Sequence, residues 1–157
     1  MNKVNEIINN KLFIDKIQKL KLIEKDRIFC KHGIEHLLDV ARIAYIKNLE
    51  EKLGYDKEVI YGAALLHDLG RVSEYEENIP HHIGGISIAK EILHETSYTD
   101  IEIDLILKAI GNHRNKNADG LSEILYLSDK KSRNCFLCES QKECNWSTEK
   151  RNKNILY

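Results

Sequence analysis

Apolar residues recur every three or four positions along most of this chain, and this spacing constrains the fold more than any other feature. The clearest case is residues 34–53, where one face carries Ile34, Leu37, Leu38, Ala41, Ala44, Tyr45 and Leu49. Apolar residues at these intervals share one side of an α-helix, which has 3.6 residues per turn. The chain has a single proline and lacks the alternating pattern that predicts strands. We therefore expect an all-α fold.

The same spacing divides the chain into about six or seven helices. One or two helices are expected within residues 3–24, followed by helices over residues 34–53, 57–69, 81–95, 101–112 and 121–132. Asp56 and Asp100 are expected to cap two of these helices, and the polar residues 72–80 to form a mobile connection. A chain of 157 residues is long enough for one domain with a real core.

Charge and hydropathy exclude several classes of function. A formal net charge of -1 gives no basic field that would attract long nucleic acids or an anionic membrane. No apolar run reaches 18 residues, so no membrane span is expected, and the N-terminus does not resemble a signal peptide. We therefore expect a cytoplasmic protein, and in that reducing compartment its four cysteines are not structural disulfides.

Several ionisable residues stand inside or at the ends of the apolar helices. These are His36, His67, Asp68, the neighbours His81 and His82, His113 and Asp129. Burying such groups without partners would cost roughly 1–3 kcal/mol each, and a shared cation would satisfy all of them. Imidazole and carboxylate ligands without thiolate suit Fe, Mn, Zn, Co or Ni. With either His81 or His82 counted, six candidate ligands exceed one tetrahedral site, which leaves one octahedral ion or two ions.

The order of these residues resembles the HD-domain superfamily of metal-dependent phosphohydrolases. The matching stretches are HLLDVARIA (36–44), AALLHDLGR (63–71), HHIGGISIA (81–89), AIGNH (109–113) and YLSDK (126–130), within a domain core of about residues 28–133. The resemblance implies a helical bundle, an HD-type domain over residues 1–133, with the metal site at its middle. It leaves residues 134–157 as a cysteine-containing extension packed on the same domain.

The resemblance also assigns metal ligands. His36, His67, Asp68 and Asp129 would form the core set, with Asp68 bridging two divalent transition metals. His81 and His113 would be the additional ligands of a two-ion subgroup, which includes small bacterial enzymes that cleave dinucleoside polyphosphates. His82 is the alternative to His81. In the family pattern three residues separate this histidine from a glycine, and that spacing back from Gly85 favours His81.

The expected reaction is hydrolysis of a nucleotide or similar small phosphate compound by metal-activated water. Asp68 would serve catalysis through the metals, and Arg133 and Lys130 would hold phosphate, with Arg71 and Arg114 as further cations near the ligands. Two alternatives remain open. One is a non-catalytic protein that senses metal, redox state or nucleotides, and the other is a di-iron oxygenase built on the same ligands.

The cysteines suggest a second site. Cys135, Cys138 and Cys144 follow a C-x2-C-x5-C pattern after the Asp129 helix, and Cys30 precedes the His36 helix. If those helices share a metal, the four thiols come within reach of one another. A four-thiolate site would hold structural zinc or an iron–sulfur cluster, with His32 as a substitute ligand. The alternative is four reduced cysteines without a shared role.

Overall fold

The structure, a computed structural model, describes residues 1–157 as eight α-helices and one short 3-10 helix, with no strand. The helices are α1 (Asn2–Asn9), α2 (Lys11–Ile23), α3 (Ile34–Glu50), α4 (Lys57–Leu66), α5 (Arg71–Glu77), α6 (His81–His94), α7 (Asp100–Asn112), α8 (Gly120–Lys131) and the 3-10 helix η1 (Cys135–Leu137). The predicted all-α class is confirmed. No helix has the length and apolar character needed to cross a membrane.

Two details of the predicted elements were wrong. Residues 72–80 are not a mobile connection, because most of them belong to α5, whose Val72 and Ser73 are buried. A seven-residue helix is not stable by itself, so packing of α5 against α2 and α6 must hold it, and a local pattern cannot show that. The cap of α7 is Thr99 rather than Asp100, and it forms a capping box with Glu102.

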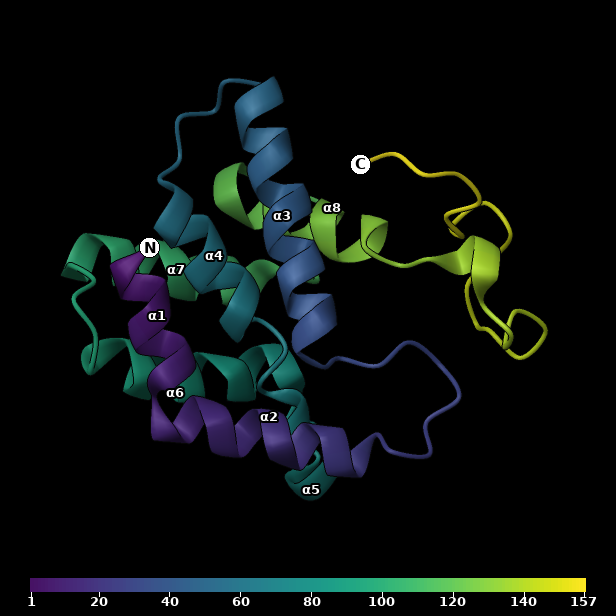
Figure 1. Ribbon diagram of the computed structural model, residues 1–157, viewed down its shortest axis with the longest axis horizontal. Helices are drawn as coiled ribbons and strands as arrows, with labels where there is room; N and C mark the ends of the chain where they lie inside the picture. The colour runs from purple at the N-terminus through teal and green to yellow at the C-terminus, as the bar shows by residue number, and fades with distance from the viewer.

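Helices α3 and α4 pack against each other at the middle of the bundle, as Figure 1 shows. Helix α8 lies against α3, and α7 lies against α4, α6 and α8. The apolar side chains of these helices form one continuous core with α1 and α2. This arrangement brings the ends of α4, α6 and α7 and one side of α3 and α8 towards a common centre.

Residues 134–157 leave α8 and run beside the connection between α2 and α3, at one side of the bundle (Figure 1). The Ser140 hydroxyl donates to the backbone carbonyl of Ile28 at 2.8 Å. The Asn152 amide donates to the backbone carbonyls of Lys130 and Arg133 at 2.7 and 2.9 Å. The C-terminal segment therefore contacts both the connection before α3 and the end of α8.

Candidate metal centre

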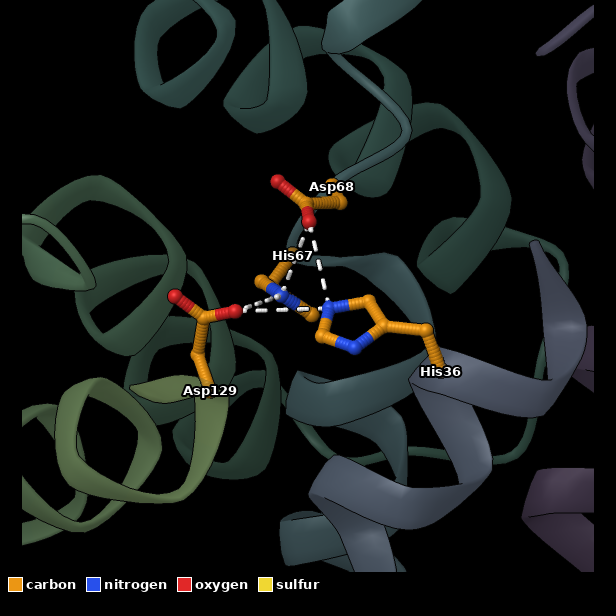
Figure 2. A group of neighbouring side chains, drawn as sticks. All are labelled: His36, His67, Asp68 and Asp129. Atoms are coloured by element: carbon orange, nitrogen blue, oxygen red, sulfur yellow. Dashed lines mark ion pairs between the residues drawn. The ribbon is translucent and has the colours of Figure 1, made fainter. Parts of the chain in front are cut away.

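Four side chains from three parts of the chain meet at the centre of the bundle (Figure 2). His36 comes from α3, Asp129 from α8, and His67 and Asp68 from the turn after α4. His36 Nε2 lies 3.5 Å from Asp68 Oδ2 and 3.3 Å from Asp129 Oδ1. His67 Nε2 lies 3.2 Å from Asp68 Oδ2 and 4.0 Å from Asp129 Oδ1. All four residues are buried, so their donor atoms face one another rather than water.

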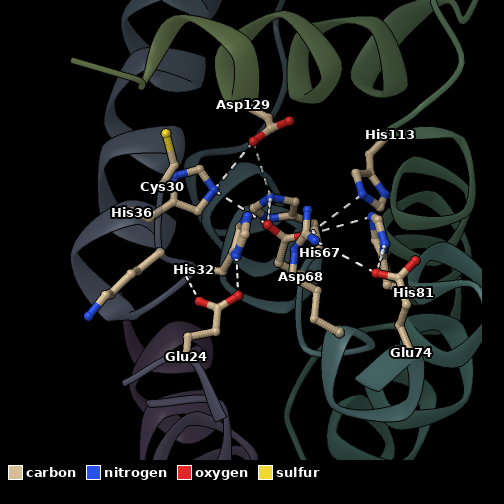
Figure 3. A network of polar contacts seen from close by, with 12 residues as sticks. Glu24, Cys30, His32, His36, His67, Asp68, Glu74, His81, His113 and Asp129 are labelled. Atoms are coloured by element: carbon tan, nitrogen blue, oxygen red, sulfur yellow. Dashed lines mark hydrogen bonds and ion pairs between the residues drawn. The ribbon is translucent and has the colours of Figure 1, made fainter. Parts of the chain in front are cut away.

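A second group of donors lies on the other side of Asp68 (Figure 3). Asp68 Oδ1 is 3.8 Å from Nε2 of His81, the first residue of α6. It is 3.9 Å from Nε2 of His113, which directly follows α7. His82 takes no part in either group, so the structure brings together His81 and not its neighbour.

Asp68 therefore belongs to both groups, with one carboxylate oxygen turned towards each. Its position depends on where α4 stops. The sequence predicts a helix to residue 69, but α4 ends at Leu66, and His67 and Asp68 lie in the turn that follows. This turn lets two adjacent side chains reach one centre.

The other ring nitrogen of each histidine fixes the direction of its ring. The Nδ1–H groups of His67 and His113 donate to the backbone carbonyls of Ala64 and Ile110, at 2.7 and 2.6 Å. His81 Nδ1 lies 2.8 Å from a carboxylate oxygen of Glu74. Because carbonyls and carboxylates only accept hydrogen bonds, Nδ1 carries the proton and Nε2 of the neutral ring has a free lone pair.

His36 is fixed in a similar way. Its Nδ1 lies 3.1 Å from the Ser132 hydroxyl, and that hydroxyl donates to the backbone carbonyl of Asp129 at 2.8 Å. Since the hydroxyl proton is used there, its oxygen is left to accept from His36 Nδ1. All four histidines thus turn Nε2 towards the carboxylates.

Buried polar atoms without partners occur in this centre. His67 Nε2, Asp68 Oδ2 and His81 Nε2 are all buried and make no hydrogen bond. An unsatisfied buried polar group costs about 1–3 kcal/mol, so three at one place indicate that a partner belongs there. Imidazole nitrogens and carboxylate oxygens fit a divalent transition metal. The residues present therefore fit such an ion on the donor chemistry and on their unmet hydrogen-bonding capacity.

The pKa values at the centre favour the metal-binding forms of most of these groups. Burial, with His67 nearby, lowers the pKa of His113 to about 3, and burial and Arg71 lower the pKa of His81. Burial opposes ionisation of Asp68, but His67 and Arg71 hold its pKa well below the ordinary value. The two outer histidines are therefore neutral and the bridging carboxylate is charged at neutral pH.

At His67 and Asp129, neighbouring groups outweigh the effect of burial on the pKa. Burial lowers the pKa of His67, but the Asp68 and Asp129 carboxylates outweigh it, so the pKa of His67 is raised. Burial also opposes ionisation of Asp129, yet the neighbouring His36 ring, 3.3 Å away, keeps the pKa of Asp129 well below the ordinary value. Two carboxylates this close to His67 attract positive charge, which a divalent ion would supply.

The predicted catalytic cations lie directly beside these carboxylates. Arg133 Nη2 lies 3.1 Å from both His36 Nε2 and Asp129 Oδ1, and Lys130 Nζ lies 2.6 Å from Asp129 Oδ2. Arg71 Nε donates to Asp68 Oδ1 at 2.9 Å. Arg114 is exposed and lines the pocket outside the centre. The cations thus reach the edge of the centre and the pocket in front of it.

Sequence reasoning missed three polar residues near the centre, of which Glu74 contacts a candidate ligand directly. Glu74 contacts His81. Glu24 contacts buried His32 twice: it accepts a hydrogen bond from the His32 backbone N–H and lies 2.6 Å from Nδ1 of the His32 ring. The Tyr75 hydroxyl donates to the same Glu24 carboxylate at 2.8 Å. Glu24 ends the pattern of α2, where a charged residue is unremarkable, so no local signal distinguishes it. Only the tertiary structure shows that Glu24 is buried and contacts His32.

A pocket of about 390 Å³ opens in front of the centre. Its walls include His81, His113 and Asp129 from the two donor groups. All four cysteines also line this pocket, but no three of their sulfurs are gathered as closely as the donor atoms of the His and Asp groups. Cys30, Cys135, Cys138 and Cys144 are all free thiols.

An all-helical bundle whose central histidine and aspartate side chains could hold a divalent metal defines the class of this protein. Residues 33–134 match the HD domain family, so the chain belongs to that family. HD domains bind divalent metals, and the family lies within the metal-dependent phosphohydrolase superfamily, whose members are generally hydrolases. The resemblance seen in the sequence is thereby confirmed.

Curated relatives match the chain to different extents. An uncharacterized protein of Clostridium beijerinckii is 46% identical over 157 residues and covers 100% of both chains. Ribonuclease Y of Clostridium kluyveri is 29% identical over 98 residues, which are 62% of this chain and 18% of that protein. Ribonuclease Y of Petrotoga mobilis is 31% identical over 97 residues, which are 56% of this chain and 18% of that protein. No solved structure matches the chain.

Proposed function

We propose that the chain is a metal-dependent phosphohydrolase that cleaves a nucleotide or a similar small phosphate ester or anhydride. The observation that carries this proposal is the position of Asp68, whose two oxygens face two separate groups of buried donors. His36, His67 and Asp129 would hold one divalent ion with Asp68, and His81 and His113 would hold the second. Bound ions of this kind lower the pKa of water to about 7 and so supply hydroxide at neutral pH.

The charge of the pocket supports an anionic substrate. Its walls carry six cationic side chains and two carboxylates; the cations are Arg27, Arg71, Arg114, Lys130, Arg133 and Arg151. Arg133 and Lys130 are paired with Asp129, a carboxylate that a divalent ion would also use. Neutralisation of Asp129 would leave both cations available for phosphate oxygens, and a guanidinium group binds phosphate with two parallel hydrogen bonds.

The size and walls of the pocket support a small substrate with an aromatic part. A volume of about 390 Å³ lies within the range usual for small-molecule sites. Phe29 and Trp146 add aromatic surface to its walls. A base stacked on an aromatic ring typically contributes about 1–3 kcal/mol to binding. Phosphate at the cations and a base against an aromatic ring together describe a nucleotide.

The similarity to ribonuclease Y raises RNA as an alternative substrate. The matched region corresponds to only 18% of those proteins, so their activity belongs to a much longer chain. The net charge of -1 does not favour a long nucleic acid, since phosphate contacts by cations dominate such binding. We therefore place small nucleotides first. The predicted cytoplasmic location remains a prediction.

The test combines metal analysis with a substrate panel. Protein purified without oxygen is loaded with Mn, Fe or Co and assayed with nucleoside phosphates, dinucleoside polyphosphates and a short RNA. We expect release of phosphate or nucleoside monophosphate, and its loss together with bound metal in Asp68→Ala. Asp39→Ala is the matched control, because Asp39 pairs with Arg42 away from the centre. Nucleotide binding without turnover would favour a sensor, and oxygen consumption with an organic substrate would favour an oxygenase.

A further inference from the structure

The C-terminal segment, residues 134–157, is ordered without an apolar core of its own. Cys135 is the one residue in this segment that is buried. Apart from η1, the segment contains no helix. Small units that cannot bury enough apolar surface usually depend on a disulfide or a structural metal. Since the cysteines are free thiols, this segment needs another means of attachment to the bundle.

All four cysteines of the chain line the same pocket. Cys135, Cys138 and Cys144 belong to the C-terminal segment, whereas Cys30 comes from the connection between α2 and α3. Near the thiols, one hydrogen bond from the C-terminal segment and one from Arg133, directly before it, reach the connection between α2 and α3. The Ser140 hydroxyl donates to the carbonyl of Ile28, and Arg133 Nη1 donates to the carbonyl of Lys31 at 3.3 Å. Cysteines distant in sequence are thus neighbours in the fold.

Positive charge surrounds the thiols. Arg27 Nε donates to the backbone carbonyl of Cys30 at 3.0 Å, and Arg151 Nη2 donates to that of Cys144 at 3.2 Å. The pKa of the Cys30 thiol is raised, chiefly by partial burial and also by the nearby Cys135 and Cys138, while Arg133 opposes the shift. Nearby guanidinium groups stabilise thiolates, the form of cysteine that binds metals.

The spacing of the sulfurs bears on the kind of metal. Four thiolates around one zinc ion, at about 2.3 Å in a tetrahedron, lie about 3.8 Å apart. No three of these sulfurs lie within 4.8 Å of one another. An iron–sulfur cluster distributes four cysteines over several iron atoms, so its ligands lie farther apart. The open spacing around a pocket therefore fits a cluster better than a single ion.

We propose that Cys30, Cys135, Cys138 and Cys144 bind an iron–sulfur cluster that fastens the C-terminal segment over the pocket. This site is separate from the His and Asp donors, although both open on the same pocket. The cluster replaces the missing apolar core of the segment and fixes the wall that carries Trp146 and Arg151. The inference does not depend on the proposed hydrolase activity.

The first experiment measures iron, zinc and acid-labile sulfide in protein purified without oxygen, or reconstituted with ferrous iron and sulfide. We expect bound sulfide, brown colour and visible absorption. The sulfide distinguishes this site from the His and Asp centre, because iron bound there would carry none. Wild-type protein without sulfide after reconstitution, or with zinc alone at the cysteines, would overturn the proposal.

Two variants locate the cluster. Cys30→Ser should lose the sulfide and the visible absorption, and it should keep its helices because Cys30 is exposed and lies outside every helix. Asp68→Ala should lose the ions of the His and Asp centre and keep the sulfide. Circular dichroism checks that both variants fold. Undiminished sulfide in folded Cys30→Ser would contradict the assignment.

Limited proteolysis provides a readout that needs no variant. Reconstituted wild-type protein should be cleaved within residues 134–157 at least tenfold more slowly than the same protein without the cluster. Equal cleavage rates would show that the cysteines do not fasten this segment.

Discussion

At the scale of single residues, the direction of each histidine ring decides what the centre can bind. Carbonyl groups occupy Nδ1 of His67 and His113, the Glu74 carboxylate occupies Nδ1 of His81, and the Ser132 hydroxyl occupies that of His36. Such partners raise the basicity of the free nitrogen and orient it before a metal arrives. The sequence predicted that these histidines are candidate ligands. It did not predict the groups that orient their rings.

Glu74 offers a direct test of this orientation. Glu74→Ala should weaken binding at the ion held by His81 and His113 by about 10–100-fold, since removal of a residue that orients a ligand has effects of this size. The ion held by His36 and Asp129 should be little affected. Calorimetric titration with Mn or Zn measures the two binding steps separately.

Glu76→Ala is the matched control, because Glu76 lies on the same helix and pairs with Lys19 at the surface. Its two binding steps should equal those of the wild type. Equal weakening of both ions by Glu74→Ala, or of neither, would argue against the assigned role of Glu74.

Buried His32 predicts a pH dependence of stability. Burial lowers its pKa from 6.5 to about 4, although Glu24 opposes the shift. Between these values the unfolded chain binds a proton that the folded chain does not, so the free energy of unfolding falls as the pH falls. From pH 6.5 to 5 the loss should be about 2 kcal/mol from His32 alone. In His32→Gln this contribution disappears.

Urea denaturation of metal-free protein at several pH values measures this difference. The wild-type curve should fall more steeply between pH 6.5 and 5 than the curve of His32→Gln. The comparison removes the contributions of the other histidines, which both proteins share. Parallel curves would mean that His32 does not have a lowered pKa in the folded protein.

At the scale of elements, the site depends on where helices end. Helix α4 ends at Leu66, α6 begins at His81 and α7 ends at Asn112, so the ligands lie at or beside these ends. Gly70 lets the turn after α4 approach α6. A Cβ atom at Gly70 would lie 2.0 Å from the carbonyl oxygen of His81 and 2.3 Å from the nitrogen of Gly85. Both contacts are with backbone, which cannot move aside as a side chain can.

Gly70→Ala should therefore lower the free energy of unfolding by at least about 3 kcal/mol and displace His81. Urea denaturation measures the stability, and metal titration measures the site. In Gly33→Ala the new Cβ would meet only the flexible end of Glu35, at 3.1 Å, so its stability should change much less. Equal stability of the two variants would show that the close approach at Gly70 is unimportant.

At the scale of the whole molecule, the bundle gathers charged side chains at its centre, where a divalent cation would satisfy them. Asp68 and Asp129 are both buried and ionised, and His67 lies between them with a raised pKa. The cations of Arg71, Lys130 and Arg133 supply partial compensation. A divalent ion adds charge at the centre itself, so metal binding should stabilise the whole fold.

A divalent ion at 100 times its Kd should stabilise the folded chain by about 2.7 kcal/mol. For a chain of this length, that corresponds to an increase in Tm of roughly 5–10 °C. Calorimetry after addition of Mn or Zn to chelator-treated protein measures this increase. Asp68→Ala should show little increase, and Asp39→Ala should respond as the wild type does. A similar increase in Asp68→Ala would place the stabilising ion elsewhere.

The repeat of apolar residues determined the all-α class, since that spacing is compatible with a helix and not with a strand. It also placed His36 and Asp129 on helices that face the core. It failed for α5, because a short helix exists through its packing and not through its own pattern. It also failed for Glu24, because a charged residue that will be buried looks like one that will be exposed. It failed for Glu74 because the contact of that residue with His81 arises from tertiary packing.

By itself, then, the sequence determined which residues are candidate ligands, and it placed His36 and Asp129 on the correct helices. The tertiary structure alone decided that α4 would end before His67 and Asp68, that Glu74 would contact the His81 ring, and that Glu24 would be buried. The physical reason is the distance along the chain over which each property is determined. Helical periodicity is a property of neighbouring residues, whereas a site depends on where distant helices end and on which polar atoms their packing removes from water.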